Sequence, residues 1–171
     1  MKSAILAALI SSCLFSSEAS ATWFARTDSG GKLLVTGVAE NPDQSVASVY
    51  LTCEGSIVSV EVLTEMNASA IDIADYHGTK IVLGYKTKDG EAKKMGLNGE
   101  PVLSAGDGVA IRAKLTAEQS SALYNSIGRG RRLDVELIHP ELTDDTGVKK
   151  VMADGFTSAL MAMSKACPGL E

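Results

Sequence analysis

The chain of 171 residues has few of the residue types that build catalytic and stacking sites. It contains two histidines, and aromatic residues make up 5% of the sequence. Stacking surfaces for sugars or bases need several aromatic rings, so the composition offers little support for such a surface. The two histidines leave serine catalysis possible across the fold.

The sequence also lacks the short motifs that mark common enzymes and metal sites. It has no Cys-x-x-Cys pair, no Gly-x-Ser-x-Gly elbow and no calcium-loop spacing of acidic residues with its glycine and final glutamate. We therefore expect no metal, no cofactor and no catalytic residue, and we predict a protein that is not an enzyme.

No excess of positive charge and no long apolar run is present. The formal net charge is −5, which argues against nucleic acid or an anionic membrane as the partner. The longest apolar stretch, Ala4 to Leu14, is shorter than the roughly 20 residues of a membrane-spanning helix. We expect no transmembrane segment, and the sequence does not indicate an oligomeric state.

The first 21 residues have the features of an export signal. Lys2 precedes the apolar stretch, and Ala19-Ser20-Ala21 is the small-x-small pattern that a signal peptidase accepts. We predict cleavage after Ala21, a periplasmic or secreted protein, and one domain over residues 22–171. An alternative stays open, because Ile10-Ser11-Ser12-Cys13 resembles a bacterial lipobox and would give a lipoprotein anchored through Cys13.

Removal of the leader leaves two cysteines, Cys53 and Cys167. In an oxidising compartment, two thiols are most simply interpreted as one disulfide. A bridge over more than 100 residues would stabilise the fold by roughly 4–5 kcal/mol in the chain-entropy model, as an upper value. We predict that this bridge holds the scaffold rigid.

The clearest local structure surrounds Glu54-Gly55, between VASVYLTC and SIVSVEVL. A two-residue loop at Glu54-Gly55 predicts a hairpin with Cys53 and a row of apolar side chains on its core face. Its other face would carry Tyr50, Thr52 and Ile57, which we consider as a surface for a partner.

Alternating or apolar runs predict further strands, and two segments are typical of helices. The strands are expected at 33–39, 81–85, 92–95 (after a turn at Asp89-Gly90), 109–115, 132–137 and 148–152. Thr116 and Gln119 match a capping box for a helix that ends near Gly128, and a second helix runs from near Gly155 to Cys167. This order predicts a mainly β (α+β) fold: an antiparallel sheet or β-sandwich with two peripheral helices, the C-terminal one disulfide-linked to the central hairpin.

Three polar clusters deserve a chemical interpretation. Asp72, Asp75 and His77 could form a metal site or an acid–base pair, and His139 with three acids of the next turn, Glu141, Asp144 and Asp145, could bind a cation. We interpret both as solvated loops. Arg129, Arg131 and Arg132 could hold a phosphate or carboxylate. We favour solvated arginines in a glycine-rich turn.

The last 60 residues resemble a known kind of exported protein. Gly155-Phe156-Thr157-Ser158-Ala159-Leu160 and Cys167 follow Leu133-Asp134-Val135, and this pattern resembles small proteobacterial proteins of the invasion-associated locus B type. With Trp23 and Leu51-Thr52-Cys53, the ending is also similar to periplasmic accessory proteins of type VI secretion. Both resemblances imply a β-rich exported domain without an established catalytic site.

These observations predict a non-enzymatic periplasmic or secreted binding or accessory protein. Its partner would be a protein of the bacterial envelope or of a secretion system. Two alternatives stay open: a hydrolase whose site is assembled from distant residues, and an inhibitor of a secreted enzyme that presents the segment Asp72 to Gly78.

Overall fold

The computed structural model describes the greater part of the chain that follows the predicted leader. The described residues are 23–27, 33–40, 46–67, 73–104, 108–129, 132–140, 149–151, 153 and 155–167. The predicted leader with Cys13, and also Asp72, Arg131, Glu141, Asp144 and Asp145, lie outside them.

The strands of the described structure form one antiparallel sheet in the order β6-β5-β9-β10-β2-β3-β4-β8-β7. Strand β1 is not on this path and pairs with β2, as β10 does. The strands are β1 Trp23–Thr27, β2 Leu33–Glu40, β3 Val46–Glu54, β4 Ile57–Asn67, β5 Lys80–Lys86, β6 Ala92–Asn98, β7 Glu100–Leu103, β8 Gly108–Lys114, β9 Leu133–Ile138 and β10 Lys149–Val151. The predicted mainly β, antiparallel fold is confirmed.

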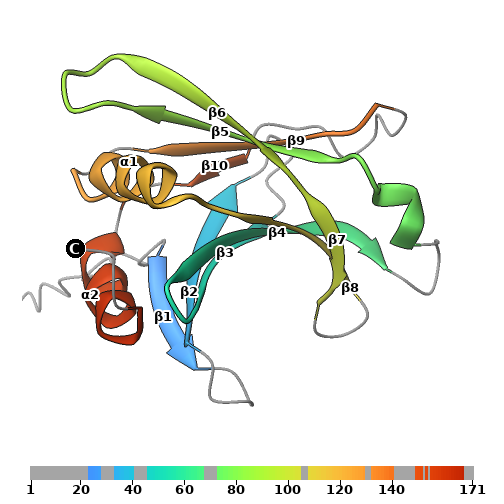
Figure 1. Ribbon diagram of the computed structural model, residues 1–171, viewed down its shortest axis with the longest axis horizontal. Coiled ribbons are helices and arrows are strands. Elements are labelled where there is room, and N and C mark those ends of the chain that lie inside the picture. The colour runs from blue at the N-terminus through green and yellow to red at the C-terminus, as the bar shows by residue number, and fades with distance from the viewer. Residues whose placement is uncertain are drawn as a thin grey trace, which may run out of the picture.

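The sheet folds into two layers that face each other across the core. Figure 1 shows β5, β6, β9 and β10 lying over β2, β3 and β4, with both helices at the same side of the molecule. The strands at the two ends of the sheet order, β6 and β7, are consecutive in the chain and separated only by Gly99. One bent strand therefore pairs with β5 in the first layer and with β8 in the second.

Alternation of side chains produces the core, as the sequence predicts. In the second layer the buried row of β3 and β4 contains Val49, Leu51, Val60 and Val62. In the first layer, Ile81 and Leu83 of β5 and Leu133, Val135 and Leu137 of β9 are buried in the same way. Each strand thus turns one apolar face inward, where burial contributes about 25 cal/mol per Å².

The hairpin of β3 and β4 differs from the prediction by one residue in its turn. Its loop is Gly55-Ser56, and Cys53 pairs with Val58, whereas a Glu54-Gly55 loop would pair Cys53 with Ser56. Gly55 has φ +65°, so it takes the first central position of the turn, where primed hairpin turns need positive φ. The pairing moves by two residues, and every side chain keeps its predicted face.

Both predicted helices are present. Helix α1, Ala117–Ile127, begins with the complete capping box: Thr116 Oγ1 accepts from the Gln119 N–H, and Gln119 Oε1 accepts from the Thr116 N–H. Helix α2, Phe156–Ala166, buries Phe156, Ala159 and Met163 along one stripe. A short 3-10 helix, η1, Ile73–Tyr76, precedes β5.

Helix α2 is attached to the sheet by an aromatic corner and a disulfide. Trp23 lies over Gly37, where a side chain would collide with the indole, and its ring meets Phe156 edge-to-face at 5.2 Å between centroids. At the other end of the helix, Cys167 is bonded to Cys53 of β3, 114 residues away. The predicted disulfide and its attachment of the C-terminal helix to the central hairpin are confirmed.

Within the part of the chain that the structure describes, neither helix has the length and apolar character needed to cross a membrane. Strands β1 and β7 and the short helix η1 were not predicted from the sequence. Their segments are only four or five residues long, which is too short for alternation to be distinguished from a loop.

Candidate binding surface

The strands of the second layer carry a separate set of side chains on the side away from the core. One row across β1, β2, β3, β4, β8 and β7 consists of Phe24, Thr36, Tyr50, Glu61, Arg112 and Glu100. The next row consists of Arg26, Leu34, Thr52, Ser59 and Lys114. We call these rows, together with Ile57 at the hairpin end, the outer face.

The helices do not pack on the outer face in the described structure. Helix α2 reaches the sheet through Phe156 on Trp23 and through the Cys53–Cys167 bond. Trp23 and Cys53 point to the side opposite Phe24 and Thr52, because neighbouring residues of a strand alternate. The helix therefore closes the core side of the sheet.

Two large apolar side chains are exposed on the outer face. Phe24 is 41% exposed in the first row, Ile57 is 48% exposed at the hairpin end, and Tyr50, in the row of Phe24, is half-buried. The Arg26 guanidinium lies 5.7 Å from the centroid of the Tyr50 ring, within the range of a cation–π contact. The face thus combines an aromatic group with a cation that is fixed above it.

An ion pair joins β4 to β8 on this face. Two guanidinium nitrogens of Arg112, Nη2 and Nε, lie 2.8 and 2.9 Å from Oε2 of Glu61. The Glu61 side chain is 10% exposed, whereas Arg112 is 39% exposed. A pair that is shielded in this way holds both side chains in one geometry and is less screened by salt than a fully solvated pair.

The three residues that the sequence indicated as a partner surface do share this face, but they do not contribute equally. Tyr50 and Ile57 present side-chain surface, whereas Thr52 is 4% exposed. Thr52 is shielded because its short side chain lies in the row between Leu34 and Ser59, beside the larger Tyr50. The sequence did not predict the other members of this surface, because their positions depend on the order of the strands in the sheet. These are Phe24, Arg26 and the Glu61–Arg112 pair.

The two histidines come together although they are 62 residues apart. His139 Nε2 lies 3.1 Å from the carbonyl oxygen of His77, and its ring centroid is 6.4 Å from that of Tyr76. A carbonyl oxygen only accepts, so Nε2 carries the proton in this contact. Among the described residues, no group of three or more histidine, cysteine or acidic side chains is arranged to hold a metal ion.

The segment considered for an inhibitor loop is pinned along part of its length. Tyr76 is buried, the Thr79 hydroxyl donates to its carbonyl oxygen at 2.6 Å, and the His77 N–H donates to the Ala74 carbonyl. Asp75 and His77 remain exposed. The segment is a structured turn beside β7 with a small polar surface.

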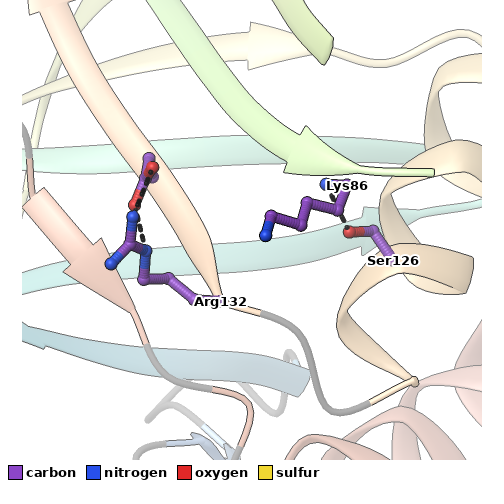
Figure 2. A network of polar contacts seen from close by, with 4 residues as sticks. Lys86, Ser126 and Arg132 are labelled. Atoms are coloured by element: carbon purple, nitrogen blue, oxygen red, sulfur yellow. Dashed lines mark hydrogen bonds and ion pairs between the residues drawn. The ribbon is translucent and has the colours of Figure 1, made fainter. Parts of the chain in front are cut away.

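Of the arginine cluster, the structure describes Arg129 and Arg132, and Arg131 lies outside the described residues. Arg129 is exposed after the end of α1, while Arg132 binds Asp134 with Nε at 2.8 Å from Oδ1 and Nη2 at 3.3 Å from Oδ2. Figure 2 shows Arg132, which immediately precedes β9, and Lys86 of β5, whose N–H donates to Ser126 Oγ at 3.2 Å. The sequence did not predict that Lys86 lies near Arg132, because this depends on the pairing of β5 with β9.

Comparisons of the chain with family models, with curated proteins and with solved structures found no match. No family is therefore assigned, and the resemblances noted from the sequence stay predictions.

Proposed function

We propose that this protein is a non-enzymatic binding or accessory protein of the bacterial envelope, exported and cut after Ala21. It binds a protein partner, a component of the envelope or of a secretion system, through the outer face. The observation that carries this proposal is the exposure of Phe24 and Ile57 on one face of the sheet, which they share with Tyr50 and on which α2 does not pack. Contiguous exposed apolar surface marks interaction sites, and we propose that Phe24 and Ile57 are the apolar anchors of such a site.

The composition of the outer face supports a protein as the partner. Aromatic residues and arginine dominate the binding energy of protein interfaces, and the face offers Phe24, Tyr50, Arg26 and Arg112. Its charges are mixed, with Arg26, Arg112 and Lys114 against Glu61 and Glu100. A mixed surface does not favour a polyanion over a protein.

The size of the face suggests a modest interface. Six strands spaced about 4.8 Å apart, each covered over about five residues of 3.3 Å, give an area of about 480 Å². That is about half of what one side of a typical stable complex buries, roughly 800 Å². The proposed partner therefore docks a single segment, and the complex forms and dissociates readily.

The test compares variants of the mature protein in envelope extracts of its native host. The double variant Phe24→Ser/Ile57→Ser removes the exposed apolar side chains, and Met161→Ser, on a residue of α2 that is 60% exposed, is the matched control. Affinity capture followed by mass spectrometry should recover a partner with the wild type and with Met161→Ser, and lose it with the double variant. Equal recovery from all three proteins would refute the proposal.

A hydrolase is the competing function, and it has its own test. The purified protein is assayed against a panel of ester, peptide and glycoside substrates, and His77→Ala and His139→Ala are assayed beside it. We expect no turnover. Turnover that disappears in one histidine variant would replace the binding function with an enzymatic one.

A further inference from the structure

The solvent side of the first layer brings together cations from three strands. Gly84 of β5 pairs with Lys94 of β6 on one side and with Asp134 of β9 on the other. Lys86 lies two residues after Gly84, and Arg132 lies two residues before Asp134. Because side chains two apart in a strand share a face, all of these groups belong to the same face as Gly84.

Contacts of the side chains confirm this arrangement. Lys94 Nζ lies 3.8 Å from Oε2 of Glu136, which is on the Asp134 face of β9, and Arg132 binds Asp134 directly. Figure 2 shows the Lys86 side chain reaching toward the strand that carries Arg132. Diagonal neighbours in an antiparallel pair are roughly 7–8 Å apart, so Lys86 and Lys94 are close like charges.

The positive charges of this group exceed its internal negative charges. Asp134 balances Arg132, and within the described structure Lys86 has no ion-pair partner. Lys94 has only Glu136 at 3.8 Å, and its own side chain is 76% exposed, a pair that contributes little. Lys86, which has no ion-pair partner, and Lys94, which has a weak one, therefore lie near Gly84 on the same face of the sheet.

Gly84 lets the Asp134 side chain lie close against β5: a Cβ added at Gly84 would lie 3.2 Å from Cβ of Asp134. Gly84 itself is partly exposed, with Lys86, Lys94 and Arg132 around it on the same face. The backbone of Lys86 is held in place because its N–H donates to Ser126 Oγ of α1.

We propose that Lys86, Lys94 and Arg132 around Gly84 form a binding site for a phosphate group. A phosphate monoester carries close to two negative charges at neutral pH, which matches the two lysines that the protein leaves poorly balanced. Lysine binds phosphate as a mobile point charge, and the Arg132 fork supplies a directional donor. The phosphate could be free or could belong to the headgroup of an anionic lipid, where the diester carries one negative charge, and the site is separate from the outer face.

The first experiment titrates the mature protein, isotopically labelled, with inorganic phosphate at low ionic strength and follows the amide resonances. The Gly84, Lys86 and Lys94 signals should shift together and saturate in the millimolar range. Lys86→Gln and Lys94→Gln should each weaken binding by about two- to fivefold. Lys165→Gln, which removes an exposed lysine of α2, should leave binding unchanged and is the matched control.

A variant that is expected to strengthen binding distinguishes this site from nonspecific attraction of phosphate to surface lysines. Asp134→Asn removes the carboxylate that competes for Arg132, so phosphate should bind several times more tightly than to the wild type. Near-UV circular dichroism of each variant checks that the sheet is intact. Unchanged or weaker binding in a folded Asp134→Asn protein, or equal losses in Lys86→Gln and Lys165→Gln, would overturn the proposal.

The source of the phosphate group is decided with vesicles. Sedimentation with phosphatidylglycerol vesicles, compared with phosphatidylcholine vesicles, should show salt-sensitive binding that Lys86→Gln weakens if the site takes a lipid headgroup. Saturable binding of inorganic phosphate without vesicle binding assigns the site to a free phosphorylated molecule. Absence of both overturns the site, while the outer-face proposal, tested by protein capture, is unaffected.

Discussion

Single residues decide how the two layers of the sheet are joined, and Gly99 is the clearest case. It lies between Asn98, which pairs with Lys80, and Glu100, which pairs with Arg112. Its N–H donates to the Thr79 carbonyl at 2.9 Å. A Cβ at this position would overlap Cγ2 of Ile111 and lie 2.9 Å from that carbonyl oxygen, so only glycine fits the bend.

Gly99→Ala should lower the free energy of unfolding by about 2–3 kcal/mol, because the core and the Thr79 backbone must shift to admit a methyl group. Urea unfolding followed by circular dichroism measures the change. Gly96→Ala is the control: its Cβ would meet nothing within 4 Å, and we expect a change within about 0.5 kcal/mol. Similar losses in the two variants would show that the bend has no special need for glycine.

Tyr124 is a buried residue whose ionisation should affect the pH dependence of the free energy of unfolding. Its ring stacks on Phe156 at 5.9 Å, its hydroxyl donates to Sδ of Met163 at 3.3 Å, and burial raises the pKa of that hydroxyl well above its usual value. The unfolded chain releases this proton near pH 10 and the folded chain retains it, so stability falls as the pH rises above about 10.

The wild type should therefore lose up to about 1.4 kcal/mol per pH unit more than Tyr124→Phe between about pH 10 and 12. At neutral pH the variant should be less stable by about 1 kcal/mol, since it lacks the hydrogen bond to Met163. Urea midpoints at several pH values provide the comparison. Parallel pH profiles for the two proteins would show that Tyr124 ionises as easily in the folded state as in the unfolded chain.

At the scale of elements, the attachment of α2 to β3 has the largest expected effect. The Cys53–Cys167 bond closes a loop of 114 residues, and α2 brings Phe156 onto the single tryptophan, Trp23. The double variant Cys53→Ser/Cys167→Ser should lose about 3–5 kcal/mol of stability, since the unfolded chain gains the freedom that the bridge removes.

Unfolding curves followed by Trp23 fluorescence measure this loss directly. Reduction of the wild type should give the same curve as the double variant, and the double variant should be insensitive to reductant. A wild type whose curve does not move on reduction would mean that the bridge contributes nothing to stability.

At the scale of the whole molecule, the boundary of the mature chain is the feature to test. Cleavage after Ala21 would make Trp23, the first residue of β1 and 1% exposed, the second residue of the mature chain. The mature protein purified from its native host should have the mass of residues 22–171 with one disulfide. A mass increased by lipid on Cys13 would instead support the anchored alternative.

Much of the local structure could be predicted, because its causes lie within a few residues. The alternation in β3, β4, β8 and β9, the capping box at Thr116 and the stripe of α2 are local patterns, and all were predicted. The hairpin turn was placed one residue early, since Glu54-Gly55 and Gly55-Ser56 both allow a glycine with positive φ and keep the same faces.

The candidate surfaces were predicted only in part. Tyr50 and Ile57 follow from the alternation of one hairpin, but Phe24 joins them only because β1 pairs with β2. Lys86 and Lys94 approach Arg132 only because β5 lies between β6 and β9. Strand order depends on which surfaces bury the most apolar area together, and no short stretch of sequence contains that information.

The sequence alone determined the faces of the strands, the limits of both helices and the pairing of Cys53 with Cys167, since periodicity, capping and thiol count are properties of neighbouring residues or of composition. Only the tertiary structure decided that one strand bends at Gly99 to join two layers, that the outer face stays free of α2, and that cations from three strands surround Gly84. These outcomes depend on contacts between distant segments, whose free energy is gained only when the whole sheet is assembled.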